Sequence, residues 1–267
     1  MFCQKYNFIL TRLNNQAFLV PFERIMEKPE IIWEDDNYVA VNKPSGWLSI
    51  PDRFDANKPN ILGFLNKLYA KVYVIHRIDK DTSGLILFAK NAEAHQWAND
   101  QFSSHTVCKK YLTLVIGRTP EEGEINFKIT EDPIHAGRMM CHHKYGKESL
   151  TIYKTIDNYA CGMSLLEVEP KTGRTHQIRV HCLTAGFPLV IDPFYGGEEG
   201  IFLSAIKRKF KLSVNQEQEN PLMNRLTLHA SSLEFIPMGS TKHIKIEAPL
   251  TKDFRAVVQQ LNKWSKK

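Results

Sequence analysis

A dense cluster of polar residues with potential for chemistry lies between two apolar stretches in the first third of the chain. Its sequence is HRIDKDTSG, residues 76–84. The flanking stretches VYVIH (72–76) and LILFA (85–89) are typical of β-strands. Two strands hold the ends of a loop rigidly, which suits the positioning of a reactive carboxylate. The pattern does not say whether Asp79 or Asp81 would react, and it is also typical of a charged turn in solvent.

A second cluster, TGRTHQIRVH at 172–181, is rich in cationic and imidazole side chains. These are Arg174, His176, Arg179 and His181. The spacing predicts a helix with Thr175 as its cap and Gly186 at its C-terminal end. Because helix N-termini and arginines both attract anions, the cluster predicts a phosphate or carboxylate site. Surface arginines without a ligand are the alternative.

The elements that must position these clusters are mainly strands. Strand patterns occur at 31–34, 38–41, 72–76, 85–89, 111–117, 165–169, 225–235 and 243–248. Helical patterns occur at 91–104, where Asn91 is a suitable cap, in the segment after Thr175, and from Thr251 onward. Strands outnumber helices and do not alternate regularly with them. This predicts an α+β fold with a mostly antiparallel sheet.

Composition and charge limit the class of protein. The 267 residues are 43% hydrophobic and 24% charged, which is typical of a globular protein. No apolar run approaches the roughly 18 residues that span a bilayer, and the N-terminus does not resemble a secretory signal. We therefore expect a cytoplasmic protein. The net charge of +6 is compatible with a polyanionic partner.

The cysteines and histidines do not form a recognisable metal or disulfide motif. The five cysteines at 3, 108, 141, 161 and 182 lack C-x-x-C spacing, which indicates reduced thiols. The ten histidines include no H-E-x-x-H, and the adjacent His142 and His143 cannot easily serve one ion. We expect no metal.

Seven blocks in order along the chain resemble the RluA-type pseudouridine synthases. They are EDDNYVAVNKPSGWLS (34–49), HRIDKDTSGLILFAKN (76–91), KKYLTLVIG (109–117), KTGRTHQIRVH (171–181), GFPLVIDPFYG (186–196), LTLHASSLEF (226–235) and EAPLTKDF (247–254). Ile78 is a conservative departure from the family's usual leucine. The resemblance implies a mixed, mainly antiparallel sheet with flanking helices and a central RNA-binding cleft. It also implies an isomerase that converts uridine of ribosomal or transfer RNA into pseudouridine, acting as a monomer.

The resemblance assigns catalytic roles to three residues. Asp79 falls on the family's essential aspartate, and Arg179 is expected to pair with it. Tyr111 is expected to pack against the target base, and it is a candidate for taking the C5 proton.

The resemblance also suggests how RNA is bound. Arg77 is similar to the arginine that enters the RNA stack when the target base flips out. His76, Arg174 and His176 are expected to contact RNA as well. Residues 1–30 form an extension too short for the S4 domain of many relatives, and 31–267 form a single catalytic domain in this interpretation.

Without an S4 domain, RNA selection would fall to the catalytic domain and its insertions. The segment 198–221 is polar and irregular, and we expect it beside the cleft. Its basic residues Lys207, Arg208, Lys209 and Lys211 are the predicted phosphate contacts, with a solvated charged insertion as the alternative.

The implied reaction suits these residue types. It breaks the N1–C1′ bond and rejoins the sugar to C5, so no group or electron enters from outside and no cofactor is expected. A carboxylate can attack C1′, attack C6 or abstract a sugar proton. The target base must leave its stack at a cost of a few kcal/mol, and aromatic and arginine side chains can replace the lost stacking.

Two other functions use similar residues. A glycoside or nucleoside hydrolase would need a second carboxylate, for which Asp81 is the available residue, and it would release free uracil. A non-catalytic RNA-binding protein would bind RNA without isomerising it. The presence of Asp79, Tyr111 and Arg179 together favours the isomerase.

Overall fold

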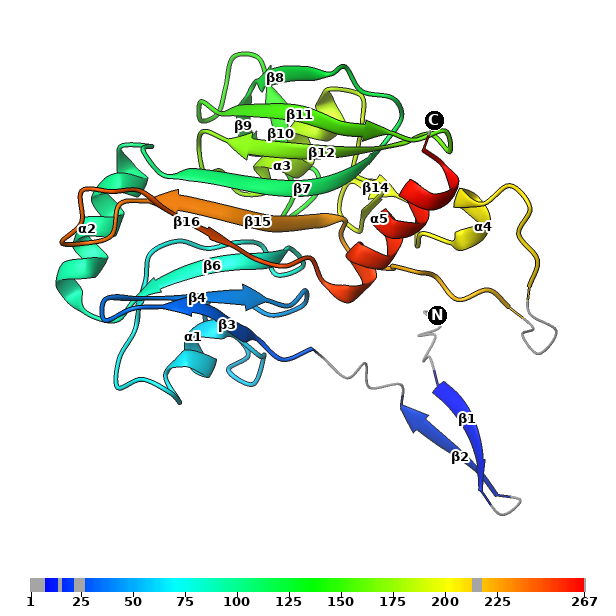
Figure 1. Cartoon of the computed structure of the whole chain (residues 1–267), viewed down its shortest axis with the longest axis horizontal. Coiled ribbons are helices and arrows are strands. Elements are labelled where there is room, and N and C mark those ends of the chain that lie inside the picture. Colours follow the sequence, from blue (N-terminus) through cyan, green and yellow to red (C-terminus); the bar gives the residue numbers. More distant parts are fainter. Residues whose placement is uncertain (1–7, 14–15, 22–26, 213–217, 267) are drawn as a thin grey trace.

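One large sheet forms the centre of the molecule in the computed structural model, which describes residues 8–13, 16–21, 27–212 and 218–266. Its ten strands are β3 (Glu30–Glu34), β4 (Tyr38–Lys43), β5 (Tyr73–Val74), β6 (Ser83–Ala89), β7 (Cys108–Ile116), β8 (Glu122–Asn126), β11 (Leu150–Asn158), β12 (Met163–Pro170), β15 (Leu228–Phe235) and β16 (Ile244–Glu247). The main order is β3-β4-β6-β15-β7-β12-β11-β8 (Figure 1). Its pairings are antiparallel except that of β15 with β6. The predicted α+β fold with a mixed, mainly antiparallel sheet is confirmed.

Three two-stranded sheets and five helices complete the described part of the chain. The small sheets pair β1 (Phe8–Leu13) with β2 (Gln16–Pro21), β9 (Lys128–Glu131) with β10 (Met139–His142), and β13 (Ile191–Asp192) with β14 (Gly196–Gly197). The helices are α1 (Ile61–Leu65), α2 (Ala92–Ser103), α3 (Gln177–Thr184), α4 (Leu203–Ile206) and α5 (Lys252–Trp264). None of these helices is long and apolar enough to cross a membrane.

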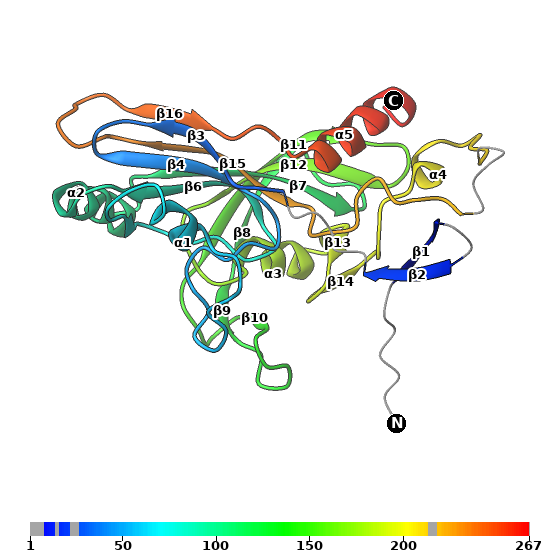
Figure 2. The same ribbon diagram turned by 90° about the horizontal axis from the view of Figure 1, so that it is seen from below.

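Helices α3 and α5 cover opposite faces of the sheet (Figure 2). Side chains alternate between faces along a strand, and β7 shows the consequence. Leu114 packs with Phe254 and Val257 of α5, whereas its neighbour Val115 packs with Ile178 of α3. Strand β6 is buried at every position, in keeping with its apolar run from Leu85 to Ala89.

The helix starts differ in how well the sequence predicted them. Asn91 caps α2, and its side chain accepts a hydrogen bond from the backbone N–H of Ala94 at 2.8 Å. Thr175 does not cap α3, because the N-cap residue is His176, whose side chain makes no capping hydrogen bond. Instead, Oε1 of Gln177 accepts the backbone N–H of Arg174 at 3.0 Å and closes the preceding turn.

The parallel contact between β6 and β15 lies just after the polar loop at 76–82. Gly84 has a φ of +107° and pairs with Ala230. A Cβ at position 84 would lie 2.2 Å from the carbonyl oxygen of Ala230. Glycine is therefore required here both by its backbone conformation and by the close approach of β15.

We predict that Gly84→Ala destabilises the fold much more than Gly117→Ala. Gly117 also has a positive φ, +94°, but nothing lies within 4 Å of a Cβ built there. The free energy of unfolding of the Gly117 variant should fall only by the cost of backbone strain, about 1–3 kcal/mol. That of the Gly84 variant should fall further, because the added Cβ must also push β6 and β15 apart. Urea unfolding followed by tryptophan fluorescence measures both. Equal losses would show that the β6–β15 approach is not a constraint.

Candidate active site

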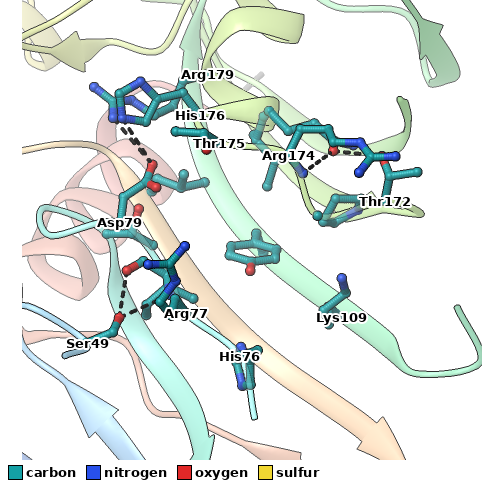
Figure 3. Close-up of a pocket in the computed structure, with 18 of the residues that line it drawn as sticks. Ser49, His76, Arg77, Asp79, Lys109, Thr172, Arg174, Thr175, His176 and Arg179 are labelled. Atoms are coloured by element: carbon teal, nitrogen blue, oxygen red, sulfur yellow. Dashed lines mark hydrogen bonds and ion pairs between the residues drawn. The ribbon is translucent and has the colours of Figure 1, made fainter. Parts of the chain in front are cut away.

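The two polar clusters of the sequence meet across one pocket of about 600 Å³ (Figure 3). One wall comes from the loop before β6 and contains Asp79. The opposite wall comes from the turn before α3 and from α3 itself. The predicted residues that line the pocket are His76, Arg77, Asp79, Tyr111, Arg174, His176 and Arg179.

Arg179 joins the two walls through a buried array of charges. Its side chain is only 2% exposed, and its Nε and Nη2 donate to the two carboxylate oxygens of Asp192 at 2.8 and 2.7 Å. Its Nη1 donates to Oδ2 of Asp79 at 3.3 Å, which confirms the predicted pairing. Burial lowers the pKa of Arg179, but the hydrogen bonds and charges of Asp192 and Asp79 outweigh it and raise that pKa overall.

The two aspartates differ in exposure and therefore in what they can do. The Asp79 side chain is 27% exposed and faces the pocket, whereas that of Asp192 is 2% exposed. Asp192 also accepts backbone N–H groups of Phe194 and Tyr195 at 2.9 and 3.2 Å. Asp192 thus orients Arg179, and Asp79 remains accessible to a substrate.

The backbone beside Asp79 is held by a buried lysine. The Lys43 side chain is fully buried and its Nζ donates to the carbonyl oxygens of Pro44, Trp47 and Lys80 at 3.1, 2.8 and 2.8 Å. Burial lowers the pKa of Lys43 to about 7, while the charges of Asp81 and Asp79 act in the opposite direction. Three carbonyl acceptors match the three N–H groups of an ammonium.

Further hydrogen bonds join the segment after Lys43 to the Asp79 loop. The hydroxyl of Ser49 donates to the carbonyl of Ile78 at 2.8 Å, and it accepts the N–H of Ile78 at 3.2 Å. The N–H of Gly46 donates to the carbonyl of Lys80 at 2.9 Å. The residues on both sides of Asp79 are therefore fixed by backbone contacts.

His176 approaches the same carboxylate from the α3 side. It has a left-handed φ of 54°, and its Nε2 lies 4.0 Å from Oδ2 of Asp79. Its Nδ1 lies 2.9 Å from the hydroxyl of Tyr195, which itself accepts the N–H of Met139. Donation of the Tyr195 hydroxyl to Nδ1 would place the imidazole proton on Nε2, toward Asp79. Burial lowers the pKa of His176 despite the charge of Asp79, so the imidazole is neutral at physiological pH.

The non-glycine residues with positive φ in the described part of the chain are His105 and His176. Both line this pocket. Strained backbone conformations tend to persist where function requires them, so their position supports the assignment of the pocket as the functional site.

Three other predicted residues also line the pocket, each in a different environment. Arg77 is exposed, and no ion pair to it occurs among the described residues. Burial and the negative charge of Asp79 raise the pKa of Tyr111, which stays a neutral phenol. His76 stacks on Phe102, accepts the N–H of Leu87 on Nε2, and has a pKa lowered to about 3 by burial. Any contact of His76 with RNA would therefore use a neutral ring.

The basic residues at 207–211 do not line this pocket. Nζ of Lys207 lies 4.4 Å from the ring centre of Trp264 in α5, and Ile206 is buried with Phe254. The segment thus packs against α5, which corrects its predicted position beside the cleft. The physical reason is that Ile206, which precedes the basic residues, is buried in the same apolar cluster as the inner face of α5. RNA contact by Lys207, Arg208, Lys209 and Lys211 stays a prediction; residues 213–217 lie outside the described residues.

Within residues 8–13, 16–21, 27–212 and 218–266, no group of three or more His, Cys, Asp or Glu side chains could hold a metal ion. The polar groups that line the pocket include the carboxylate of Asp79, the guanidinium of Arg179, the imidazole of His176 and the phenol of Tyr111.

The fold and the pocket define an RNA-modifying enzyme. The family model for RNA pseudouridylate synthase matches residues 37–184, and the chain belongs to this family. It is thus an RNA isomerase of the RluA type. Ribosomal large subunit pseudouridine synthase D of Nitrosomonas europaea is 32% identical over 93% of this chain and 67% of its own length. Dual-specificity RNA pseudouridine synthase RluA of Vibrio vulnificus is 34% identical over 77% of each chain.

A solved structure supports the same fold. Human RNA Pseudouridylate Synthase Domain Containing 4 aligns with a TM-score of 0.64 over 87% of this chain and 92% of its own, at 23% identity. The mixed, mainly antiparallel sheet is therefore shared with a pseudouridine synthase structure.

We predict that Asp192→Asn destabilises the protein by about 3–5 kcal/mol, because it removes a buried partner of a buried charge. The matched variant is Asp79→Asn, which keeps the Asp192 contacts of Arg179 and should cost at most about 1 kcal/mol. The free energy of unfolding in urea measures both. Similar losses in the two variants would contradict the assignment of Asp192 as the main support of Arg179.

Proposed function

We propose that this enzyme converts a uridine of ribosomal or transfer RNA into pseudouridine, with Asp79 as its catalytic carboxylate. The observation behind this proposal is the array in which a buried Asp192 orients Arg179 and Arg179 holds an accessible Asp79. One relative is named for the ribosomal large subunit and another as a dual-specificity RNA enzyme. The proposed catalytic domain is residues 31–267, acting as a monomer.

The charges around Asp79 suit chemistry at the glycosidic bond. Arg179 and His176 both approach Oδ2, which leaves Oδ1 as the oxygen available to the substrate. The guanidinium of Arg179 donates to this carboxylate and fixes its direction. In the reaction, the N1–C1′ bond breaks, C1′ bonds to C5, the C5 proton leaves, and N1 carries a proton in the product. Asp79 would act at the sugar or base next to the breaking bond.

Arg77 and Tyr111 would hold the target nucleotide outside the RNA stack. The exposed Arg77 can take the place of the flipped base and recover part of the lost stacking. Tyr111 lines the pocket as a neutral phenol and supplies an aromatic surface for the uracil ring. A neutral phenol is a weak base, so Tyr111 could take the C5 proton only as its own proton leaves.

The hydrolase alternative is less well supported by the geometry. Asp81, its second carboxylate, does not line the pocket. The backbone carbonyl of Asp81 accepts a hydrogen bond from Ser45 at 2.8 Å, so this residue belongs to the turn that shapes the loop. Asp79 lacks the paired carboxylate that an acid–base hydrolysis would use across the pocket.

We predict that Asp79→Asn abolishes pseudouridine formation and leaves RNA binding within about tenfold, because phosphate contacts dominate affinity. Release of tritium from RNA labelled at C5 of uridine measures turnover, and filter binding measures affinity. Asp81→Asn is the matched control, and it should keep substantial activity.

Retained turnover in purified Asp79→Asn would overturn the catalytic assignment. Free uracil as the product of the wild-type enzyme would indicate a hydrolase. A third outcome uses total RNA from a strain lacking this protein as the substrate. Binding of that RNA without formation of either pseudouridine or free uracil would indicate a binding protein.

A further inference from the structure

The pocket extends well beyond the Asp79 array to a second, cationic end. This end is lined by His76, Phe102, His105, Lys109, Thr172 and Arg174. Figure 3 shows Lys109 and Arg174 from different segments, across the pocket from Asp79. Nothing in the proposed bond chemistry uses this end.

Lys109 and Lys110 are adjacent on β7 but have different environments. Side chains alternate along a strand, and Nζ of Lys110 forms an ion pair with Glu167 at 2.6 Å. Lys109 instead lines the pocket, where its Nζ lies 5.8 Å from the ring centre of Phe102. Among the described residues, no carboxylate forms an ion pair with Lys109. Its ammonium is therefore available to an anion that enters the pocket.

The loop opposite Lys109 leaves the ammonium accessible. A Cβ built at Gly173 would lie 4.0 Å from Nζ of Lys109, so the amine directly faces this glycine. Gly173 does not have a left-handed φ, and its backbone therefore does not require glycine. The missing side chain keeps the space in front of the amine open.

Arg174 follows in the same loop with its guanidinium oriented. Its Nε donates to the carbonyl of Glu148 at 3.0 Å, which leaves the terminal Nη groups for a ligand. The negative charge of Glu169 favours the charged form of Lys109, but Glu169 is itself paired with Lys171. Burial lowers the pKa of Lys109, and an anion bound beside it would favour the charged form again.

We infer that Lys109 and Arg174 form an anion subsite for a backbone phosphodiester of the RNA strand next to the extruded uridine. The inference rests on the proposed function, in which the nucleoside occupies the Asp79 end. RNA has one phosphate per nucleotide, so a strand that enters the pocket brings a phosphate beside the nucleoside. A guanidinium and an ammonium from two elements are suited to its charge and oxygens.

The test measures binding of a probe, fluorescein-labelled penta-uridylate, by anisotropy over a range of KCl concentrations. All proteins carry Asp79→Asn so that no turnover occurs. Lys109→Met keeps most of the side-chain length and removes the charge, and Lys110→Met is the matched control on the same strand. Lys109→Met should weaken binding about tenfold at low salt and reduce the log–log salt slope by about 0.7, the value for one phosphate contact on a single strand.

Lys110→Met should leave both quantities unchanged, and Lys109→Arg should restore the slope. An unchanged slope in Lys109→Met, with unfolding like that of the parent protein, would overturn the subsite. Equal losses in Lys109→Met and Lys110→Met would also overturn it, since net charge alone would then explain the effect. Because this experiment measures binding without turnover, it can contradict the phosphate subsite without contradicting the catalytic role of Asp79. The turnover measurement on Asp79→Asn can likewise contradict the catalytic role without contradicting the subsite.

Discussion

The burial of one guanidinium governs the construction of this site. Removing a cation from water costs several kcal/mol unless it gains hydrogen bonds and opposite charge, and the Arg179 side chain is 2% exposed. Asp192 offsets most of this cost with two short hydrogen bonds, and Asp79 completes the array. The loop before β6, helix α3 and strand β13 must therefore meet at one point. The rest of the fold can be understood as the frame that brings these segments together.

The same frame fixes Asp79 from its other side. Lys43 and Ser49 hold the carbonyls of Lys80 and Ile78, the two neighbours of Asp79. The carboxylate is thus held through its backbone by one segment and through its side chain by another. Such a two-sided arrangement costs no reorganisation when the substrate arrives, which is the condition for electrostatic stabilisation of a transition state.

Sequence patterns predicted most strands of the large sheet, the α2 cap and the family motifs because these depend on local periodicity or on resemblance, but they did not predict β8 or β11. They did not predict Asp192, although a lone aspartate in the apolar run before Pro193 indicates a buried charge that needs a partner. In the sequence, Lys43 appears only within the family block at 34–49, since nothing local shows that it is fully buried. Tertiary packing decides which distant polar groups share one site, and local patterns do not show this. Tertiary packing also places Lys207, at the start of the 207–211 segment, against Trp264 of α5.

The two ends of the pocket differ in the charged groups that line them, since a carboxylate faces the pocket only at the Asp79 end among the described residues. At one end, Arg179 is held by Asp79 and Asp192, and Arg77 and Lys80 line the pocket beside them. In the proposed reaction, the Asp79 carboxylate would favour the positive character that develops at a sugar carbon when its glycosidic bond weakens. The other end has Lys109 and Arg174, neither of which forms an ion pair with a carboxylate of the described residues. The two parts of a nucleotide also differ in charge, because its phosphate is anionic and its reacting sugar becomes electron-poor. With the proposed subsite occupied by a phosphate, the sugar of the nucleotide would lie toward Asp79, whereas a reversed nucleotide would place its phosphate against that carboxylate.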